Sequence, residues 1–228
     1  MRLTPSSRIA IRYAIGAAAF ACAAMFAGWW AILLGWIALV LAIMAAAYAW
    51  IGPGVYCKKN GRIPVWNRLL LWPHALGLFV VRNWQFRRMT QPWNKVVSGV
   101  VLGRKLGVED AHMVIVEHDI SAALDLCAEH SEAPQLLGPA YMNVPVLDLL
   151  APTVEELRSA AAFIDEHSSR GCVYVHCGIG KSRSAAAVAA YLLESGQAET
   201  VAQACEMVRA ARPSARFSDG VRAELEAF

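Results

Sequence analysis

Acidic side chains are absent from almost half of this 228-residue chain, since no Asp or Glu precedes Glu109. Charge of either sign is missing between Tyr13 and Cys57, where no Asp, Glu, Lys, Arg or His occurs. Hydrophobic residues make up 57% of the sequence, against roughly 45–50% in an average globular protein. A long uncharged segment within so apolar a chain excludes an ordinary soluble protein.

The charges that are present divide the chain at residue 108. Residues 1–108 hold 13 of the 21 Lys and Arg and none of the 18 acids, which leaves 8 basic and 18 acidic residues in 109–228. The two parts therefore carry net charges of +13 and −10. A basic, aromatic-rich segment suits a nucleic acid or an anionic membrane surface, and the adjacent apolar run favours the membrane. No nucleic-acid-binding module is recognisable, so we expect no nucleic-acid partner.

The uncharged stretch is 45 residues long, whereas about 20 helical residues cross the hydrocarbon core of a bilayer. It therefore predicts two membrane-spanning helices, near residues 12–29 and 32–51, with Gly28-Trp29-Trp30 in the turn at the far interface. The run is too long for the apolar core of a signal peptide, so we expect no cleavage. A buried helical hairpin of a soluble protein is the alternative, but such a hairpin would keep a polar face.

Basic residues flank both ends of this predicted hairpin, as expected on the cytoplasmic side of a cell or inner membrane. An even number of spans agrees with that orientation and predicts that both termini and the rest of the chain are cytoplasmic. Thiols stay reduced in that compartment, and the six cysteines show no paired spacing that suggests disulfides. The flanking basic residues are Arg2, Arg8, Arg12, Lys58, Lys59, Arg62 and Arg68.

Residues 58–92 mix aromatic and basic side chains around the apolar run Leu69–Val81, which Pro73 and His74 interrupt. A run of about 13 residues is too short for a third perpendicular crossing. It favours a helix that lies in the membrane interface, with basic and aromatic side chains at headgroup level. A simple juxtamembrane linker is the alternative.

The remaining residues, 93–228, have mixed composition and suffice for one domain with a core of its own. Short apolar runs alternate there with helical patterns, which predicts an α/β sandwich around a central, mainly parallel sheet flanked by helices. We therefore expect three parts: a two-span hairpin (1–57), a basic aromatic segment (58–92) and this domain (93–228). The predicted strands are Val96–Leu102 as a pair turning at Ser98-Gly99, Ala122–Cys127, Tyr141–Leu147 and Cys172–His176, and the predicted helices are Val154–His167, Arg183–Glu194 and Val201–Ala211.

The most informative residues are His176-Cys177-Gly178-Ile179-Gly180-Lys181-Ser182-Arg183-Ser184, between the strand that ends at His176 and the helix that begins at Arg183. A loop at a helix N-terminus presents backbone N–H groups and the positive end of the helix dipole, so it can hold a phosphate. Gly178 and Gly180 allow the backbone to fold closely around an anion. The planar guanidinium of Arg183 can hold two phosphoryl oxygens at once.

Cys177 lies at the start of this loop, where its sulfur would face a bound phosphorus. The helix dipole, the N–H groups and Arg183 all favour the thiolate, and the pKa of cysteines at such sites falls to about 3.5–7.5. A thiolate nucleophile is therefore predicted at neutral pH. Ser184 can donate a hydrogen bond to that sulfur and assist its departure from a cysteinyl-phosphate, and His176 can anchor the loop through a ring nitrogen.

This string resembles the H-C-x5-R-S/T signature of the cysteine-dependent protein tyrosine phosphatase superfamily, and its G-x-S-R-S ending is similar to the dual-specificity branch. The resemblance covers roughly residues 93–228, including Val144–Asp148, the Arg212-Pro213 turn and a short C-terminal helix. One departure is Ile179, where Ala is common. The resemblance implies a phosphocysteine mechanism without metal or cofactor, and a general acid about thirty residues before the nucleophile.

Asp148 lies 29 positions before Cys177, directly after a predicted strand. It is therefore the candidate general acid, and a helix-capping or loop-fixing carboxylate is the alternative. Asp119 and Asp125 are less well placed, the latter because it falls inside a strand pattern. The histidines other than His176 form no constellation, and we treat them as structural or surface residues: His74, His112, His118, His130 and His167.

Other interpretations of the same loop fit less well. A nucleotide-binding P-loop requires glycine where this chain has Val175. A zinc site from Cys172, His176 and Cys177 lacks a second ligand pair, so we expect no metal. A rhodanese-type sulfur carrier also has a loop cysteine before a helix, but it does not require Arg183 followed by a hydroxyl side chain.

The sequence leaves the substrate open. A membrane-anchored tyrosine or dual-specificity protein phosphatase is the first hypothesis. A lipid phosphatase is the second, because Lys181 adds a cation to the loop, as in the similar tensin-type phosphoinositide phosphatases, and an anchor raises the effective concentration at the bilayer. Mitochondrial phosphatidylglycerophosphate phosphatases belong to the same branch. A phosphate-binding adaptor without activity is the third. The expected partners are thus the bilayer and a phosphorylated protein or phospholipid.

Overall fold

The computed structural model describes residues 4–87, 91–138 and 140–228. The chain forms two compact units. The helical unit comprises Met1–Lys59 and Ile63–Asn83, and the catalytic unit comprises Asn60–Arg62 and Trp84–Phe228. These bounds describe packing alone, so the division at residues 57 and 92 stays a prediction.

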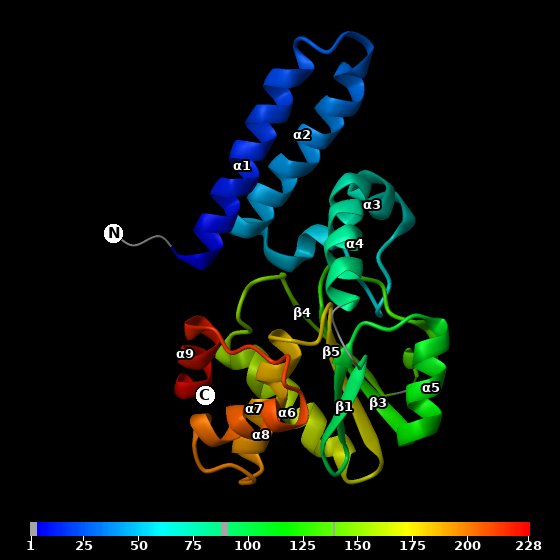
Figure 1. The fold of residues 1–228 in the computed structure, drawn as a ribbon, viewed down its shortest axis with the longest axis vertical. Coiled ribbons are helices and arrows are strands. Elements are labelled where there is room, and N and C mark those ends of the chain that lie inside the picture. Colours follow the sequence, from blue (N-terminus) through cyan, green and yellow to red (C-terminus); the bar gives the residue numbers. More distant parts are fainter. Residues whose placement is uncertain (1–3, 88–90, 139) are drawn as a thin grey trace. The chain divides into compact units, whose positions relative to one another are not determined.

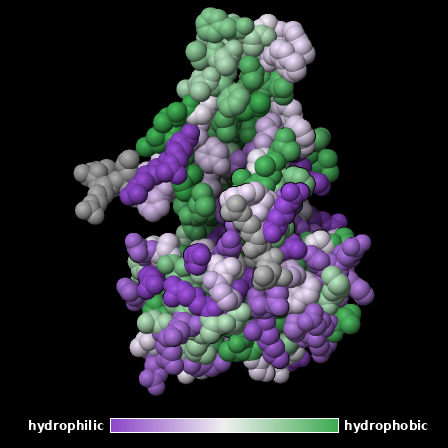
Figure 2. Space-filling view, viewed as in Figure 1, coloured by the Kyte–Doolittle hydropathy of each residue, from purple (hydrophilic) through white to green (hydrophobic). Residues whose placement is uncertain are grey.

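The helical unit is built on two antiparallel helices, α1 (Pro5–Ala24) and α2 (Ala31–Ala46), that run side by side in Figure 1. The hydroxyl of Thr4 caps α1, and Ala47–Ile51 and Gly52–Tyr56 continue α2 as π- and 3-10-helical turns. The stretches Pro5–Ala24 and Gly28–Tyr56 are long and apolar enough to cross a membrane. Apolar residues dominate the face of this unit that Figure 2 shows, whereas polar residues dominate the catalytic unit.

The connection between the helices lies where the sequence predicts it, since Gly28–Trp30 forms a single 3-10 turn. Helix α1 begins at Pro5 rather than near residue 12, because Thr4 and Pro5 supply a favourable cap and first position.

Residues 65–86 form helices α3 (Val65–Leu70) and α4 (Trp72–Phe86). Pro73 lies in the first turn of α4, where its missing N–H is not needed, so it starts this helix rather than interrupting it. The apolar run Leu69–Val81 is therefore helical but divided between α3 and α4, rather than forming one helix, and its placement at a membrane surface stays a prediction.

The catalytic unit is centred on a five-stranded sheet of order β1-β2-β5-β3-β4 (Figure 1). Strands β1 and β2 pair antiparallel around the turn at Ser98-Gly99, and the other neighbours pair parallel. Gly99 has φ +76°, which explains a glycine at this turn. The strands are β1 (Trp93–Val97), β2 (Val100–Arg104), β3 (Ile120–Cys127), β4 (Tyr141–Val146) and β5 (Cys172–Cys177).

Helices cover both faces of this sheet, because alternate residues of each strand point to opposite sides. Val101, Ala123 and Tyr174 pack in a cluster with α5 (Val108–His118), while Leu102, Leu124, Val175 and their neighbours pack in the main core. The main core also takes in α6 (Val154–Ser168), α7 (Arg183–Glu194), α8 (Val201–Ala211) and α9 (Asp219–Ala227).

The predicted α/β sandwich and its strands are confirmed, and α7 and α8 have the bounds expected from the sequence. Helix α5 was not expected. Its apolar positions Ala111 and Val114 are few, and Val116 and Met113 on the same helix are exposed, so its pattern is weak. The buried face forms only because Val101 and Tyr174 of the sheet meet it.

Candidate active site

The loop Cys177–Arg183 connects strand β5 to α7, at the carboxyl ends of the parallel strands. Gly180 has φ +72°, and a Cβ there would lie 2.3 Å from the carbonyl oxygen of Gly103 on the neighbouring strand. No other residue type therefore fits at this position without moving the loop off strand β2. The carbonyl of Cys177 accepts a hydrogen bond from the N–H of Lys105 at 2.8 Å, which fixes the start of the loop to the residue that follows β2.

The thiol of Cys177 is buried, and two donors point at it. The Gly180 N–H and the Ser184 hydroxyl each lie 3.3 Å from its Sγ. Burial by itself raises the pKa of this thiol, but the charge of Arg183 and the hydrogen bonds from Ser184 and Gly180 outweigh it and hold the pKa below its ordinary value. The geometry therefore favours a thiolate at Cys177.

The Arg183 side chain is buried beside this thiol and is held by a carboxylate that the sequence analysis did not select. Its two terminal nitrogens bind the two carboxylate oxygens of Glu129 at 2.9 and 2.7 Å, and Nη1 also donates to the Val146 carbonyl at 2.7 Å. Burial by itself raises the pKa of Glu129, but the charge and hydrogen bonds of Arg183 outweigh this effect and lower the pKa to about 2. A bidentate pair of this kind fixes the plane of the guanidinium.

Asp148 follows strand β4 and meets the same guanidinium. Its Oδ1 lies 2.9 Å from Nη2 of Arg183, and a third of its side chain is open to solvent. Burial raises the pKa of Asp148, Arg183 lowers it and the nearby charge of Glu129 raises it, with a net increase over its ordinary value. A carboxyl group with a raised pKa in this position can act as a proton donor. Leu149, the next residue, has φ +65° and is exposed.

The side chain of His176 lies on the opposite face of β5 from that of Cys177, because adjacent residues of a strand alternate. Its Nε2 is 2.5 Å from Oε2 of Glu132 and its ring stacks on Tyr174. Burial raises the pKa of Glu132, and the adjacent His176 lowers it, to about 2. The N–H of Glu132 in turn donates to the Gly61 carbonyl at 2.7 Å. His176 thus anchors the loop through a ring nitrogen, and Glu132 is its partner.

Asp125, Cys127 and His176 bring ligand-type atoms within 4.8 Å of one another. Asp125 already accepts hydrogen bonds from the Cys127 N–H and the Tyr141 hydroxyl. With Glu132 also occupying the imidazole of His176, these groups serve the packing beneath the loop, and we assign no metal to them.

Two arginines that follow α8 brace the loop from behind. Arg212 is buried and donates to the carbonyl of Gly180 at 2.6 Å, to that of Ile179 at 3.5 Å and to Oδ1 of Asn94 at 2.7 Å. The N–H of Arg216 donates to the Lys181 carbonyl at 2.7 Å. These contacts occupy the carbonyls of residues 179–181, while the Gly180 N–H points at the Cys177 sulfur.

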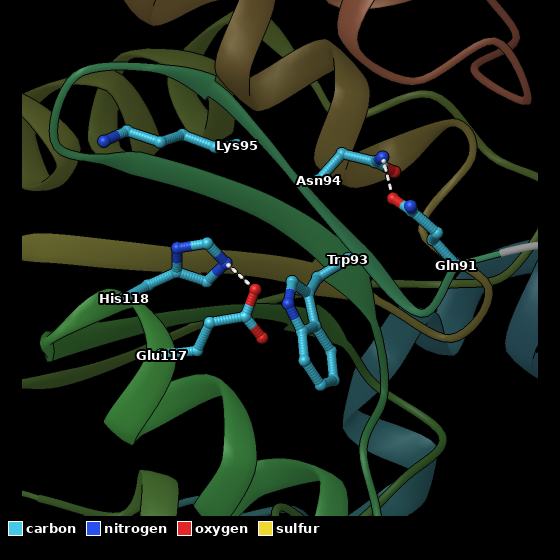
Figure 3. Close-up of a pocket in the computed structure, with 6 residues that line it drawn as sticks. All are labelled: Gln91, Trp93, Asn94, Lys95, Glu117 and His118. Atoms are coloured by element: carbon cyan, nitrogen blue, oxygen red, sulfur yellow. Dashed lines mark hydrogen bonds and ion pairs between the residues drawn. The ribbon is translucent and has the colours of Figure 1, made fainter.

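Asn94 connects this brace to a polar pocket of about 340 Å³ between strand β1 and the end of α5 (Figure 3). Asn94 donates to Gln91 at 2.8 Å, and His118 lies 3.3 Å from a carboxylate oxygen of Glu117. None of the residues selected from the sequence as site residues lines the pocket, which is formed by Gln91, Trp93, Asn94, Lys95, Glu117 and His118.

The structure therefore brings together Cys177, Ser184, Arg183 and Asp148, and it places His176 as an anchor. Gly178 lies against the Glu129–Arg183 pair, and Ser182 is the residue before α7. Glu129 and Glu132 were missed, although both come soon after the end of strand β3, at the same edge of the sheet as the loop. That position is the signal that could have selected them.

Fold and site together define a cysteine-based phosphatase, and the comparisons with known proteins agree. Residues 105–228 match the dual specificity phosphatase catalytic domain. A phosphatidylglycerophosphate phosphatase of Arabidopsis thaliana, PTPMT2, is 36% identical over 75% of this chain and 76% of its own length. The human phosphatidylglycerophosphatase and protein-tyrosine phosphatase 1 is 35% identical over 38% of this chain, a match that spans 43% of the human protein.

Solved structures show the same fold. The crystal structure of human DUSP28 superposes with a TM-score of 0.52 and 25% identity, over 61% of this chain and 93% of that one. The structure of PTPMT1 in complex with PI(5)P gives a TM-score of 0.55 at 20% identity, over 60% and 94%. This chain belongs to the dual specificity phosphatase family and is an enzyme of the cysteine-based phosphatase type.

Proposed function

We propose that this protein is a membrane-anchored phosphomonoester phosphatase that works through a phosphocysteine intermediate at Cys177. The observation that supports this most directly is the buried Cys177 Sγ, which has two hydrogen-bond donors at 3.3 Å and a lowered pKa. Arg183 and Asp148, which are 2.9 Å apart, stand beside it with the chemistry that the two steps of the reaction require.

In the first step the Cys177 thiolate attacks phosphorus and the bond to the ester oxygen breaks. Asp148 gives its proton to that oxygen, which leaves as the alcohol. Arg183 and the N–H groups of the loop hold the phosphoryl oxygens, where negative charge increases in the transition state. The raised pKa of Asp148 suits a group that must be protonated at the start of this step.

In the second step a water molecule attacks the phosphocysteine and the S–P bond breaks. The Asp148 carboxylate takes a proton from that water, so it returns to its acid form, and inorganic phosphate is released. The Ser184 hydroxyl, 3.3 Å from Sγ, stabilises the departing thiolate. No metal or cofactor takes part in this scheme.

The helical unit supports the anchoring part of the proposal. Two stretches pass the length and hydropathy requirements for a span, and the tip of the hairpin exposes Phe26, Trp29 and Ile32 by 84, 76 and 86%. Apolar side chains at such exposure suit a lipid surrounding. Basic residues at both ends predict that both termini and the catalytic unit are cytoplasmic.

Two substrate classes follow from the comparisons and from Lys181. A phosphorylated protein is the first candidate. A glycerophospholipid with a terminal phosphate, such as phosphatidylglycerophosphate, or a phosphoinositide is the second, and it is favoured by the similarity to the Arabidopsis phosphatidylglycerophosphate phosphatase over three quarters of the chain. A non-catalytic adaptor is disfavoured, because Cys177, Arg183, Ser184 and Asp148 are all present.

A substrate panel on the purified full-length protein tests both classes. The phosphate released from phosphatidylglycerophosphate, phosphoinositides and tyrosine- or serine-phosphorylated peptides is measured, with Cys177→Ser as the inactive reference. Turnover of p-nitrophenyl phosphate with no turnover of any lipid would remove the lipid candidate. No turnover of any phosphomonoester between pH 5 and 8 would contradict phosphatase activity itself.

A further inference from the structure

The ammonium group of Lys181, in the loop Cys177–Arg183, donates a hydrogen bond to a residue 96 positions earlier in the chain. Its Nζ lies 3.1 Å from Oε1 of Gln85, in the last turn of α4. Gln85 precedes residues 105–228, which match the phosphatase domain family. A residue of the same compact unit that precedes the matched residues therefore contacts the loop directly.

The end of α4 is fixed in this place by a second contact. The guanidinium of Arg104 lies over the Phe86 ring at 4.0 Å and pairs with Asp110 at 3.0 Å. Arg104 is the residue of strand β2 that pairs with Cys177 in the sheet register. Gln85 is thus attached, through its neighbour Phe86, to the strand beside the catalytic cysteine.

Lys181 is surrounded by like charge. Burial lowers its pKa, and the charges of Arg216 and Arg212 lower it further. Arg212 is buried and uses its donors on the loop, whereas Arg216 is exposed and bonds Lys181 through its backbone N–H. Within the described residues, neither Lys181 nor Arg216 forms a side-chain ion pair with an acidic group.

The choice of glutamine matters for this arrangement. An amide oxygen accepts a hydrogen bond from the ammonium group and orients it, but it leaves the positive charge uncancelled. A glutamate of the same length would form an ion pair and neutralise that charge. The site therefore keeps two cations at the rim of the loop, in addition to Arg183, and orients one of them.

We propose that Gln85 is a positioning residue: it holds Lys181, beside Arg216, where the two cations bind a second anionic group on substrates that carry one next to the scissile phosphate. This inference rests on the proposed function, because it concerns the same site. It identifies the preferred substrates as molecules with two phosphates, and it assigns part of that preference to the last turn of α4, which precedes the residues that match the family.

Two soluble substrates separate the second anion from membrane binding. Glycerol 3-phosphate carries one phosphate, and glycerophosphoglycerophosphate, the deacylated headgroup of phosphatidylglycerophosphate, carries a phosphodiester as well. Full-length Gln85→Ala and Gln85→Glu are compared with the parent protein in the same detergent. We expect the KM for the two-phosphate compound to rise about fivefold for Gln85→Ala and tenfold or more for Gln85→Glu, with kcat changed less than twofold. The KM for glycerol 3-phosphate should change much less.

A double-mutant cycle tests whether Gln85 acts through Lys181. Lys181→Met should give the same selective rise in KM, and Gln85→Ala should add nothing to it. Gln197→Ala is the matched control, because this exposed glutamine follows α7 at the end opposite the phosphate loop. If either compound is not turned over, its inhibition constant against p-nitrophenyl phosphate replaces KM.

An equal effect of Gln85→Glu on both compounds, or none on either, would overturn the positioning role while leaving the phosphatase proposal intact. Additive effects of Gln85→Ala and Lys181→Met would do the same. Loss of all phosphatase activity in the parent protein would instead contradict the proposed function. Thermal unfolding of each variant separates these outcomes from loss of the fold, and Gln85→Asn serves if the alanine variant does not fold.

Discussion

The helical unit and the catalytic unit satisfy their polar side chains in different ways. In the helical unit, such groups bind carbonyls or each other: Trp36 donates to the Leu70 carbonyl and Asn67 to the Val55 carbonyl, each at 2.9 Å. In the catalytic unit, buried charges meet opposite charges, with Glu129 on Arg183 and Glu132 beside His176. Charge is expensive to bury unless it is paired and hydrogen-bonded.

The buried charges of the catalytic unit are not spread through its core. They surround one loop, where Glu129 pairs with Arg183 and Glu132 contacts His176, the residue before the proposed nucleophile. Burying these charges costs free energy. In the proposed reaction, charges fixed in this way stabilise the phosphoryl group without reorganisation. Removal of a buried charge should therefore be most damaging in the catalytic unit, where the paired charges lie.

The largest effect should come from replacing Cys177, the group proposed to bond covalently to phosphorus. Cys177→Ser should lower turnover of p-nitrophenyl phosphate by about 10⁴-fold or more, because a serine hydroxyl is not ionised at neutral pH. Binding of inorganic phosphate, measured by calorimetry, should persist, since Arg183 and the loop N–H groups remain. Cys172→Ser, at the other end of the same strand, should stay active. A Cys177→Ser enzyme with normal turnover would contradict the phosphocysteine scheme.

Loss of the proposed proton donor, Asp148, should have the next largest effect, and that effect should depend on the substrate. Asp148→Asn should reduce kcat for an alkyl phosphate by about 100-fold or more, and less for p-nitrophenyl phosphate, whose leaving group needs no proton. The parent enzyme should lose activity as the pH rises through the raised pKa of Asp148, because the protonated form is the active one.

The pH–rate profiles of the parent and of Asp148→Asn would be measured on both substrates, with exposed Asp165→Asn as the control. Equal losses on both substrates would assign Asp148 to loop structure instead.

Breaking a buried pair tests the contrast between the units directly. Glu129→Gln should destabilise the catalytic unit by about 3–5 kcal/mol, because buried Arg183 would lose its two-oxygen partner and keep only the partly exposed carboxylate of Asp148. Chemical unfolding in detergent measures this loss, and exposed Glu194→Gln, on the same helix as Arg183, should change stability little. A near-neutral Glu129→Gln would show that the pair contributes little to the fold.

Acidification should destabilise the catalytic unit but not the helical unit, and this should be the smallest of the expected effects. The pKa values of Glu129 and Glu132 are lowered to about 2 in the folded chain, below their unfolded values near 4.3. Their ionised forms therefore contribute stability above the unfolded pKa, and this contribution is lost as the pH falls from about 4.3 towards 2. Hydrogen exchange should increase in peptides of β3 and β5 over this range.

Peptides of α1 and α2 should not respond in that window, since no acidic residue precedes Glu109. Equal increases in hydrogen exchange in both units on acidification would contradict the contrast between them. Glu132→Gln should reduce the acid sensitivity of β5, which isolates the contribution of the His176 partner.

Much of the fold and site could be predicted because the signals are local. The strand, loop and helix around Cys177 occupy adjacent positions in the sequence, and α7 and α8 were predicted with the observed bounds. Asp148 follows a strand at a typical spacing. Helix α5 has no comparable pattern, because its buried face is small and is completed by Val101 and Tyr174 of distant strands.

The sequence by itself determined the uncharged hairpin, the loop of residues 177–183 and its candidate nucleophile, since hydropathy runs and a nine-residue string are local features of the chain. Only the tertiary structure decided which carboxylates hold Arg183 and His176, and that Gln85 reaches Lys181 across 96 positions. Such pairs carry no spacing rule, because they depend on which strand ends and helix ends the folded sheet brings together.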